Sequence, residues 1–321
     1  MRFVLDIPPP VYVDRPSKVE EALKRCGASS LLAVDTETLG KKYKSLEDQV
    51  LYMGLSPGED SRYFVPRKYL RHFKPLLENT KITKALHNFK FDAHRLANAG
   101  IQIGGPVADS MIMDWLYDED TRENRHKLDD CSWDYFEVHM KKYKDVIGKA
   151  DPRDIKPGHI VWDSFLDYGS LDAWITRKLV VYLSEKLQDI DVWGDGTWSL
   201  YDHYWESEEP QVRCLFAMER KGIRIDTEML ESMASSLEEE MDSCAREVNR
   251  LAGRPINPRS PKQLGELLFG EMGLKPKKLT GTGAPSCDEE SLRYFALTED
   301  VEICKHLLKH RKASKLHGTY A

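Results

Sequence analysis

The chain has 321 residues, a net charge of −6 and a pI of about 6.0, with 41% hydrophobic and 31% charged residues. This balance is typical of a globular protein of about two domains and counts against a pure nucleic-acid-binding module, which is usually basic. No apolar run approaches the ~20 residues of a membrane span, and the first residues lack a signal-peptide pattern. The six cysteines form no Cys-x-x-Cys pair, which favours reduced thiols in a cytosol.

The first part of the chain alternates strand and helix patterns. Pro16 and a capping-box pattern at Ser17 and Glu20 predict a helix over 17–27, ended by Gly27. Apolar runs and turn residues predict strands over 31–35, 50–56, 61–65 and 82–87. We expect a helix ended by Gly100, a strand-to-helix step at 106–120, loops with short helices over 121–163, and a long helix over 164–189. This alternation predicts an α/β domain over residues 1–200.

The second part of the chain, residues 201–321, shows helical patterns only. The expected helices are 204–221, 227–252, 261–272, 288–297 and 299–313. Ser260-Pro261 is a clear helix start, with a cap residue followed by proline at the first helical position.

The tripeptide Asp-Thr-Glu occurs twice, at 35–37 and at 226–228, among nine acid-x-acid pairs in the chain. The copy at 226–228 opens a helical pattern, so Asp226 is expected to cap the helix and Glu228 to lie in its first turn. The copy at 35–37 ends a buried strand. Residues two apart on a strand point to one face, so both carboxylates project together. Burying two unpaired negative charges costs free energy, which a shared cation would offset.

Two further pairs have the four-residue spacing that places side chains on one face of a helix. Asn88 and Asp92 form the first, and Tyr168 and Asp172 form the chain's single Tyr-x-x-x-Asp. Taken singly, each residue has an ordinary structural interpretation: Asn88 as a helix cap, Asp92 as a surface acid, Tyr168 as a core aromatic. Their combination and order with Asp35 are far more specific.

Asp35-x-Glu37, Asn88-x-x-x-Asp92 and Tyr168-x-x-x-Asp172, in this order, resemble the three motifs of the DEDD exonucleases with tyrosine in the third motif. The resemblance covers residues ~30–185 and implies a ribonuclease-H-like fold, a mixed sheet flanked by helices. It implies that two Mg²⁺ or Mn²⁺ ions are bound. Asp35, Glu37 and Asp172 would hold the first, and Asp35 and Asp92 would serve the second. Tyr168 would orient the attacking water with Glu37, because a phenol is too weak a base at neutral pH.

The resemblance also indicates substrate contacts. Asn88 matches the position that contacts the terminal nucleotide, and Leu39 is a candidate wedge between terminal bases. Tyr43, Phe89 and Phe91 could stack on bases, although core packing is the stronger expectation for the two phenylalanines. A frayed 3′ end of DNA is the expected substrate, because its terminal bases are already unpaired and no energy is needed to separate them.

Sequences over 222–226, 257–269, 280–296 and 310–320 resemble the start of the polymerase domain of family A DNA polymerases, where they build the thumb. Arg311, Lys312 and Lys315 are therefore candidates to contact the DNA backbone. The sequence lacks the polymerase motifs, so we expect no polymerase activity from this chain. It would be part of a longer polymerase or one product of a split gene, partnered by the palm and fingers, in the cytoplasm of a bacterial or phage-infected cell.

Three alternatives remain open at this point. The exonuclease fold could be a catalytically silent scaffold, the chain could trim RNA, or it could be a pure interaction subunit of a split replicative polymerase. The complete set of acids argues against the first alternative, and the thumb-like segment argues against the second.

Overall fold

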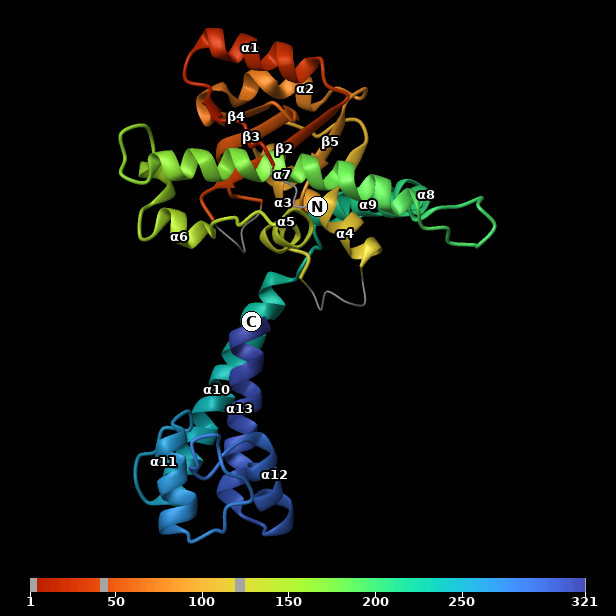
Figure 1. Ribbon diagram of the computed structural model, residues 1–321. Coiled ribbons are helices and arrows are strands. Elements are labelled where there is room, and N and C mark those ends of the chain that lie inside the picture. The colour runs from red at the N-terminus through yellow and green to blue at the C-terminus, as the bar shows by residue number, and fades with distance from the viewer. Residues whose placement is uncertain (1–4, 41–45, 119–124, 321) are drawn as a thin grey trace. The chain divides into compact units, whose positions relative to one another are not determined.

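The computed structural model describes residues 5–40, 46–118 and 125–320. The chain forms two compact units, Met1–Gly222 and Ile223–Ala321 (Figure 1). The first unit contains a sheet with helices on both faces, and the described residues of the second unit form helices and loops. No helix in the described part of the chain is long and apolar enough to cross a membrane.

The first unit is built on a six-stranded mixed sheet in the order β1-β4-β3-β2-β5-β6. β2 pairs antiparallel with β3, as does β3 with β4, and the other pairs are parallel. The strands are β1 (Pro10–Tyr12), β2 (Leu31–Thr38), β3 (Val50–Gly58), β4 (Ser61–Pro66), β5 (Thr83–Leu86) and β6 (Val107–Asp109). The expected mixed sheet flanked by helices is therefore confirmed. β2 extends three residues beyond the predicted strand, and the short β1 was missed.

Helices cover both faces of this sheet. The helices of the first unit are α1 (Pro16–Gly27), α2 (Lys74–Leu77), α3 (Phe89–Asn98), α4 (Ser110–Tyr117), α5 (Leu128–Phe136), α6 (Tyr143–Ile147), α7 (Trp162–Gln188), α8 (Leu200–His203) and α9 (Glu209–Lys221). The short α5 and α6 confirm the prediction of loops and short helices for the described residues 125–161, and α7 begins two residues before the predicted long helix. Helices α8 and α9 belong to the first compact unit, which ends at Gly222. The end of the exonuclease domain at residue 200 stays a prediction.

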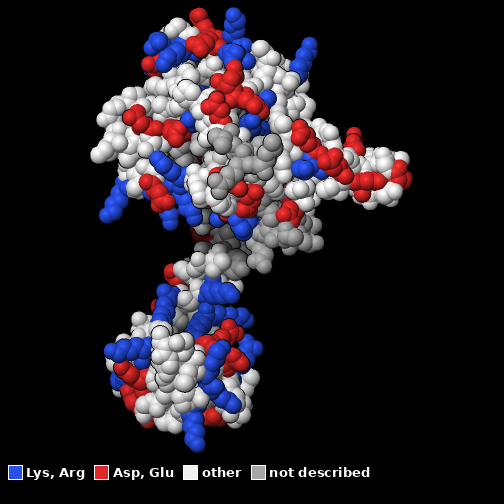
Figure 2. All heavy atoms as spheres, in the orientation of Figure 1, with Lys and Arg blue, Asp and Glu red and all other residues white. Residues whose placement is uncertain are grey.

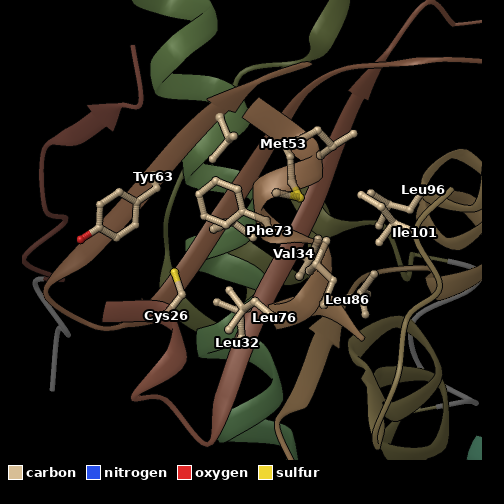
Figure 3. Packing of buried hydrophobic residues seen from close by; sticks show 14 of the residues in the cluster. Cys26, Leu32, Val34, Met53, Tyr63, Phe73, Leu76, Leu86, Leu96 and Ile101 are labelled. Carbon is tan, nitrogen blue, oxygen red and sulfur yellow. The ribbon is translucent and has the colours of Figure 1, made fainter. Parts of the chain in front are cut away.

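The alternation along β2 separates two cores. Leu32 and Val34 face the core that includes α1, α2 and α3 (Figure 3), whereas Ala33 faces the core beneath α7 and α4. On that second face, Ala33, Ala85 and Ala108 are aligned across three neighbouring strands. Their small side chains let α7 pack close to the sheet.

The first residues of the helices test the caps predicted from the sequence. Asp226 accepts a hydrogen bond from the Met229 amide at 3.0 Å, and Ser260 caps the next helix with proline following, as predicted. The capping box at Ser17 and Glu20 was wrong. Pro16 occupies the start of α1 and fixes the backbone there, so Ser17 already lies inside the helix.

The second unit is a small helical domain with its own core. Its helices are α10 (Thr227–Ala252), α11 (Pro261–Gly265), α12 (Glu289–Thr298) and α13 (Glu302–Tyr320), with a π-helical turn at Glu266–Glu271. Phe295 and Leu264 are fully buried in a cluster to which these helices contribute. α13 begins three residues later and runs further than the predicted helix over 299–313.

Candidate active site

The end of β2 distributes three polar side chains over the two faces of the sheet. Asp35 and Glu37 lie on the α7 face, in phase with Ala33. Thr36 points to the opposite face, where its Oγ1 donates a hydrogen bond of 2.6 Å to Asp92 Oδ1 of α3. Asp92 is 1% exposed, so its interpretation as a surface acid was wrong.

Helix α7 completes a carboxylate cluster with β2. Carboxylate oxygens of Asp35, Glu37 and Asp172 all lie within 4.8 Å of one another. Asp172 Oδ1 is buried, and no described residue gives it a hydrogen-bond partner. Three converging hard oxygen donors with one buried oxygen left without a hydrogen bond fit a divalent cation such as Mg²⁺ or Mn²⁺.

Two glycines allow α7 to approach the cluster this closely. Gly54 of β3 is paired with Asp35, and a Cβ built on it would lie 2.2 Å from the carbonyl oxygen of Gly169. A Cβ on Gly169 would lie 3.0 Å from Glu37 Cγ and 2.5 Å from Phe64 Cε2. Backbone therefore packs on backbone next to Tyr168, which is how a sheet residue and a helix residue come to share one site.

A buried arginine fixes the same part of α7. Arg62 of β4 is 3% exposed. Its guanidinium donates to the carbonyl oxygen of Asp167 at 2.8 Å, to Asp167 Oδ1 at 2.6 Å and to Ser170 Oγ at 3.1 Å. Because these partners flank Tyr168, Arg62 holds the helix turn that carries the tyrosine.

The carboxyl groups of the site are held far from their ordinary acidity. Burial raises the pKa of Asp35 to about 7. Burial first, and then repulsion from neighbouring carboxylates including Asp35, raises the pKa of Glu37, Asp172 and Asp92 well above the ordinary range. Removing negative charges from water with no cation beside them costs free energy, so the metal-free site retains protons.

This electrostatic strain predicts an unusual pH dependence of stability. A carboxyl group whose pKa is raised on folding stabilises the fold below its unfolded pKa near 4, and this contribution is lost as the pH rises through about 7. We expect the free energy of unfolding in EDTA to fall between pH 5 and pH 8 by an amount on the order of 2 kcal/mol, and the melting temperature to fall with it. Calorimetry checks this, and Mg²⁺ should reverse the fall. A melting temperature that rises over this range would contradict the assignment.

Asp109 was missed by the sequence analysis, and its carboxylate binds the amides at the start of α3, the helix that carries Asp92. Its Oδ1 accepts from the amides of Asn88 and Met111 at 2.9 and 3.0 Å, and its Oδ2 accepts from the Phe89 amide at 2.7 Å. It therefore caps the first turns of both α3 and α4. Asn88 adopts a left-handed conformation before α3 and makes no capping bond with its side chain, so its interpretation as a cap was wrong. The signal available for Asp109 was its place before the helix of the 106–120 step.

A cavity of about 170 Å³ lies beside Tyr168 and Asp172 and is lined also by Lys141, Lys142 and Tyr143. The ring centroids of Tyr143 and Tyr168 lie 6.0 Å apart. Burial, followed by repulsion from Asp172, raises the pKa of Tyr168 above its ordinary value, so its phenol stays protonated. The lysines were missed because they lie in a charged loop that carries no local motif.

The candidate substrate-contact residues lie in different settings. Leu39 is half-buried directly after β2. Phe89 is buried in the core, as expected, whereas Phe91 is 39% exposed under the guanidinium of Arg95, so the expectation of core packing was wrong for it. Tyr43 lies outside the described residues.

Several basic residues of the second unit line a groove between α12 and α13. Arg311, Lys312 and Lys315 all contribute to it. Arg311 is partly used within the unit, since its guanidinium donates to the Cys287 carbonyl oxygen at 2.6 Å. Contact of this groove with DNA remains a prediction.

Comparison with known proteins agrees with this geometry. The sequence profile of the 3′-5′ exonuclease family matches residues 10–188, and that of DNA polymerase family A matches residues 227–321. DNA polymerase I of Pseudomonas aeruginosa is 30% identical over 314 residues, which are 93% of this chain and 33% of that protein. DNA polymerase I of Synechocystis is 31% identical over 94% of this chain and 30% of that protein.

Solved structures show the same fold. The polymerase domain of Pol1 from M. smegmatis, in complex with DNA primer-template and dNTP, is similar with a TM-score of 0.69 and 23% identity, covering 96% of this chain and 49% of that one. Brucella melitensis NrnC bound to pGG is similar with a TM-score of 0.52 and 20% identity, covering 67% of this chain and 95% of that one. The chain spans about a third of the length of the curated relatives. The chain belongs to the 3′-5′ exonuclease family, whose profile matches residues 10–188, and residues 227–321 match the profile of DNA polymerase family A.

Proposed function

We propose that this chain removes nucleotides from the 3′ end of DNA by metal-dependent hydrolysis, as the proofreading part of a family A DNA polymerase. The observation that carries the proposal is the convergence of Asp35, Glu37 and Asp172, with Asp92 and Tyr168 beside them, in a member of the 3′-5′ exonuclease family. The mechanism, the residue roles and the substrate below are parts of the same proposal.

The proposal includes two divalent cations of the Mg²⁺ or Mn²⁺ class. Asp35, Glu37 and Asp172 would hold one, and Asp35 with Asp92 would hold the other. When bound, such a pair lowers the pKa of the attacking water and neutralises the charge that grows on the phosphate. The four carboxyl groups then lose their protons, because the cations replace the missing solvation.

The chain's own residues orient the reactants. Tyr168 is protonated at neutral pH and its hydroxyl is a hydrogen-bond partner of Asp172. Once Asp172 binds a cation, that hydroxyl would donate a hydrogen bond to the attacking water, and Glu37 would accept one. Thr36 fixes the rotamer of Asp92 through its hydrogen bond. Lys141 and Lys142 lie on the cavity beside Tyr168, where their charge suits the phosphate of the departing nucleotide, and Asn88 and Leu39 would contact its sugar and base.

The second unit supports DNA as the substrate. It matches the polymerase family, and its basic groove would contact the phosphate backbone through Arg311, Lys312 and Lys315 without reading sequence. The remaining palm and fingers would be supplied either by a longer chain or by a separate polypeptide. No polymerisation is expected from these residues alone.

Incubation of the purified chain with Mg²⁺ and 5′-labelled single-stranded DNA tests the proposal. A ladder of products shortened from the 3′ end, abolished by EDTA, is the expected result, with no extension of a primer by added triphosphates. Absence of cleavage would favour the silent scaffold or interaction subunit. Faster cleavage of RNA of the same sequence would favour the RNA-trimming alternative. Extension of a primer would contradict the expectation that this chain has no polymerase activity.

Replacement of Tyr168 by phenylalanine tests the role of its hydroxyl. We expect the single-turnover cleavage rate to fall about 10²-fold, because the water loses an orienting donor. The Mg²⁺ concentration for half-maximal rate should not change, because the hydroxyl is not a ligand. An unchanged rate would show that the Tyr168 hydroxyl does not orient the attacking water.

A further inference from the structure

A short hairpin arm, residues 190–199, connects α7 to α8 and has no part in the proposed catalysis. The two sides pair through a bridge between Asp191 and Ser199, and the Val192 amide donates to the Trp198 carbonyl oxygen at 2.8 Å. Figure 1 shows this segment extending away from the body of the first unit beyond α8.

The tip of the arm is held in one conformation by its own hydrogen bonds. The Asp191 side chain accepts from the amides of Gly196 at 2.6 Å and Trp193 at 3.1 Å. Gly194 and Gly196 have φ angles of 76° and 77°, which the tight turn requires. A surface ordered in this way loses little conformational entropy when a partner binds.

The arm displays a stacked pair of indoles. The rings of Trp193 and Trp198 have centroids 5.3 Å apart and planes 17° apart. Stacking stabilises the hairpin and covers one face of each indole ring. Trp193 nevertheless stays 64% exposed, and Val192 beside it is 45% exposed. A rigid, exposed tryptophan is typical of interface hot spots, because its large surface gains free energy when water is excluded.

The charge around the indoles has a single sign. Between Lys186 and Arg213 the chain contains no lysine or arginine. Exposed carboxylates lie within and beside the arm, at Asp189, Asp191, Asp195 and Asp202. Figure 2 shows acidic side chains gathered on the projecting part of the first unit. The phosphates of DNA would be repelled here, whereas a guanidinium group can stack on an indole and pair with a carboxylate.

From the exposed indoles and the complementary charge, we propose that the arm is a docking site for a protein partner that presents an arginine-rich segment. Hydrophobic contact with Trp193 and Val192 would supply affinity, and the carboxylates would select basic partners and speed association. The arm would thus bind a protein at a surface that DNA avoids.

Fluorescence anisotropy with the full chain tests this proposal, using a labelled peptide of four arginines spaced by Ser-Gly pairs, in ~0.15 M salt. We expect Trp193→Ser/Trp198→Ser to weaken peptide binding at least ~10-fold, and Asp189→Lys to weaken it ~3-fold or more. The matched control is Trp133→Ser, which removes another exposed tryptophan of the first unit and should change nothing. Digestion of DNA should be unchanged in all three variants, which also shows that they fold.

Three outcomes would overturn the proposal. The peptide could fail to bind the wild-type chain, or it could bind the double variant and the wild type equally. The double variant could also lose affinity for labelled DNA while it keeps its affinity for the peptide, which would assign the arm to nucleic acid.

Discussion

Asp35→Asn should abolish metal-dependent digestion of DNA while it leaves the fold intact. The substitution keeps the size of the side chain but removes a charge from the centre of the carboxylate cluster. We expect the cleavage rate at saturating Mg²⁺ to fall by roughly 10²–10³-fold or more, since the site loses electrostatic stabilisation where charge develops. In EDTA at pH 8 the same variant should melt at a higher temperature than the wild type, because one of the repelling acids is gone.

The chain carries its own matched control in the second Asp-Thr-Glu tripeptide. Asp226→Asn makes the same chemical change in the same local sequence, and asparagine is an equally good helix cap. It should leave the cleavage rate, the Mg²⁺ requirement and the melting temperature near those of the wild type. If Asp35→Asn retained more than a few per cent of the activity, or if both variants lost activity alike, the carboxylate cluster would not be the catalytic site.

Local sequence patterns predicted the acids of the site better than their surroundings. The two-residue period of a strand placed Asp35 and Glu37 on one face, and β2 confirms that geometry by running through both. The same period sends Thr36 to the other face, but its hydrogen bond to Asp92 joins residues 56 positions apart. No local pattern contains such a partner, so the burial of Asp92 was missed.

The missed elements share the same physical origin. β1 exists because three residues pair with β4, far along the chain, and not because of their own propensity. Lys141 and Lys142 reach the site because the loop before α6 packs beside α7. Pro16 overrode the capping box because a fixed φ angle at the start of the helix decides where the helix begins.

The close contact of Gly54 with α7 depends on tertiary packing in the same way, and replacing this glycine should damage the site without touching a ligand. A Cβ at Gly54 would lie 2.2 Å from the backbone oxygen of Gly169, so α7 must move away from β3. The movement carries Tyr168 and Asp172 away from Asp35 and Glu37. We expect Gly54→Ala to lower stability by about 1–3 kcal/mol and the cleavage rate by up to ~10²-fold.

The Mg²⁺ requirement separates displacement of the ligands from simple loss of stability. The Mg²⁺ concentration for half-maximal cleavage should rise in Gly54→Ala, measured well below its melting temperature, because the carboxylates no longer converge. Gly265→Ala is the matched control: Gly265 is helical, its added Cβ would meet nothing within 4 Å, and helix propensity predicts a small gain in stability with unchanged activity. If Gly54→Ala cleaved DNA at the wild-type rate and Mg²⁺ requirement, the spacing of β3 and α7 would not set the geometry of the site.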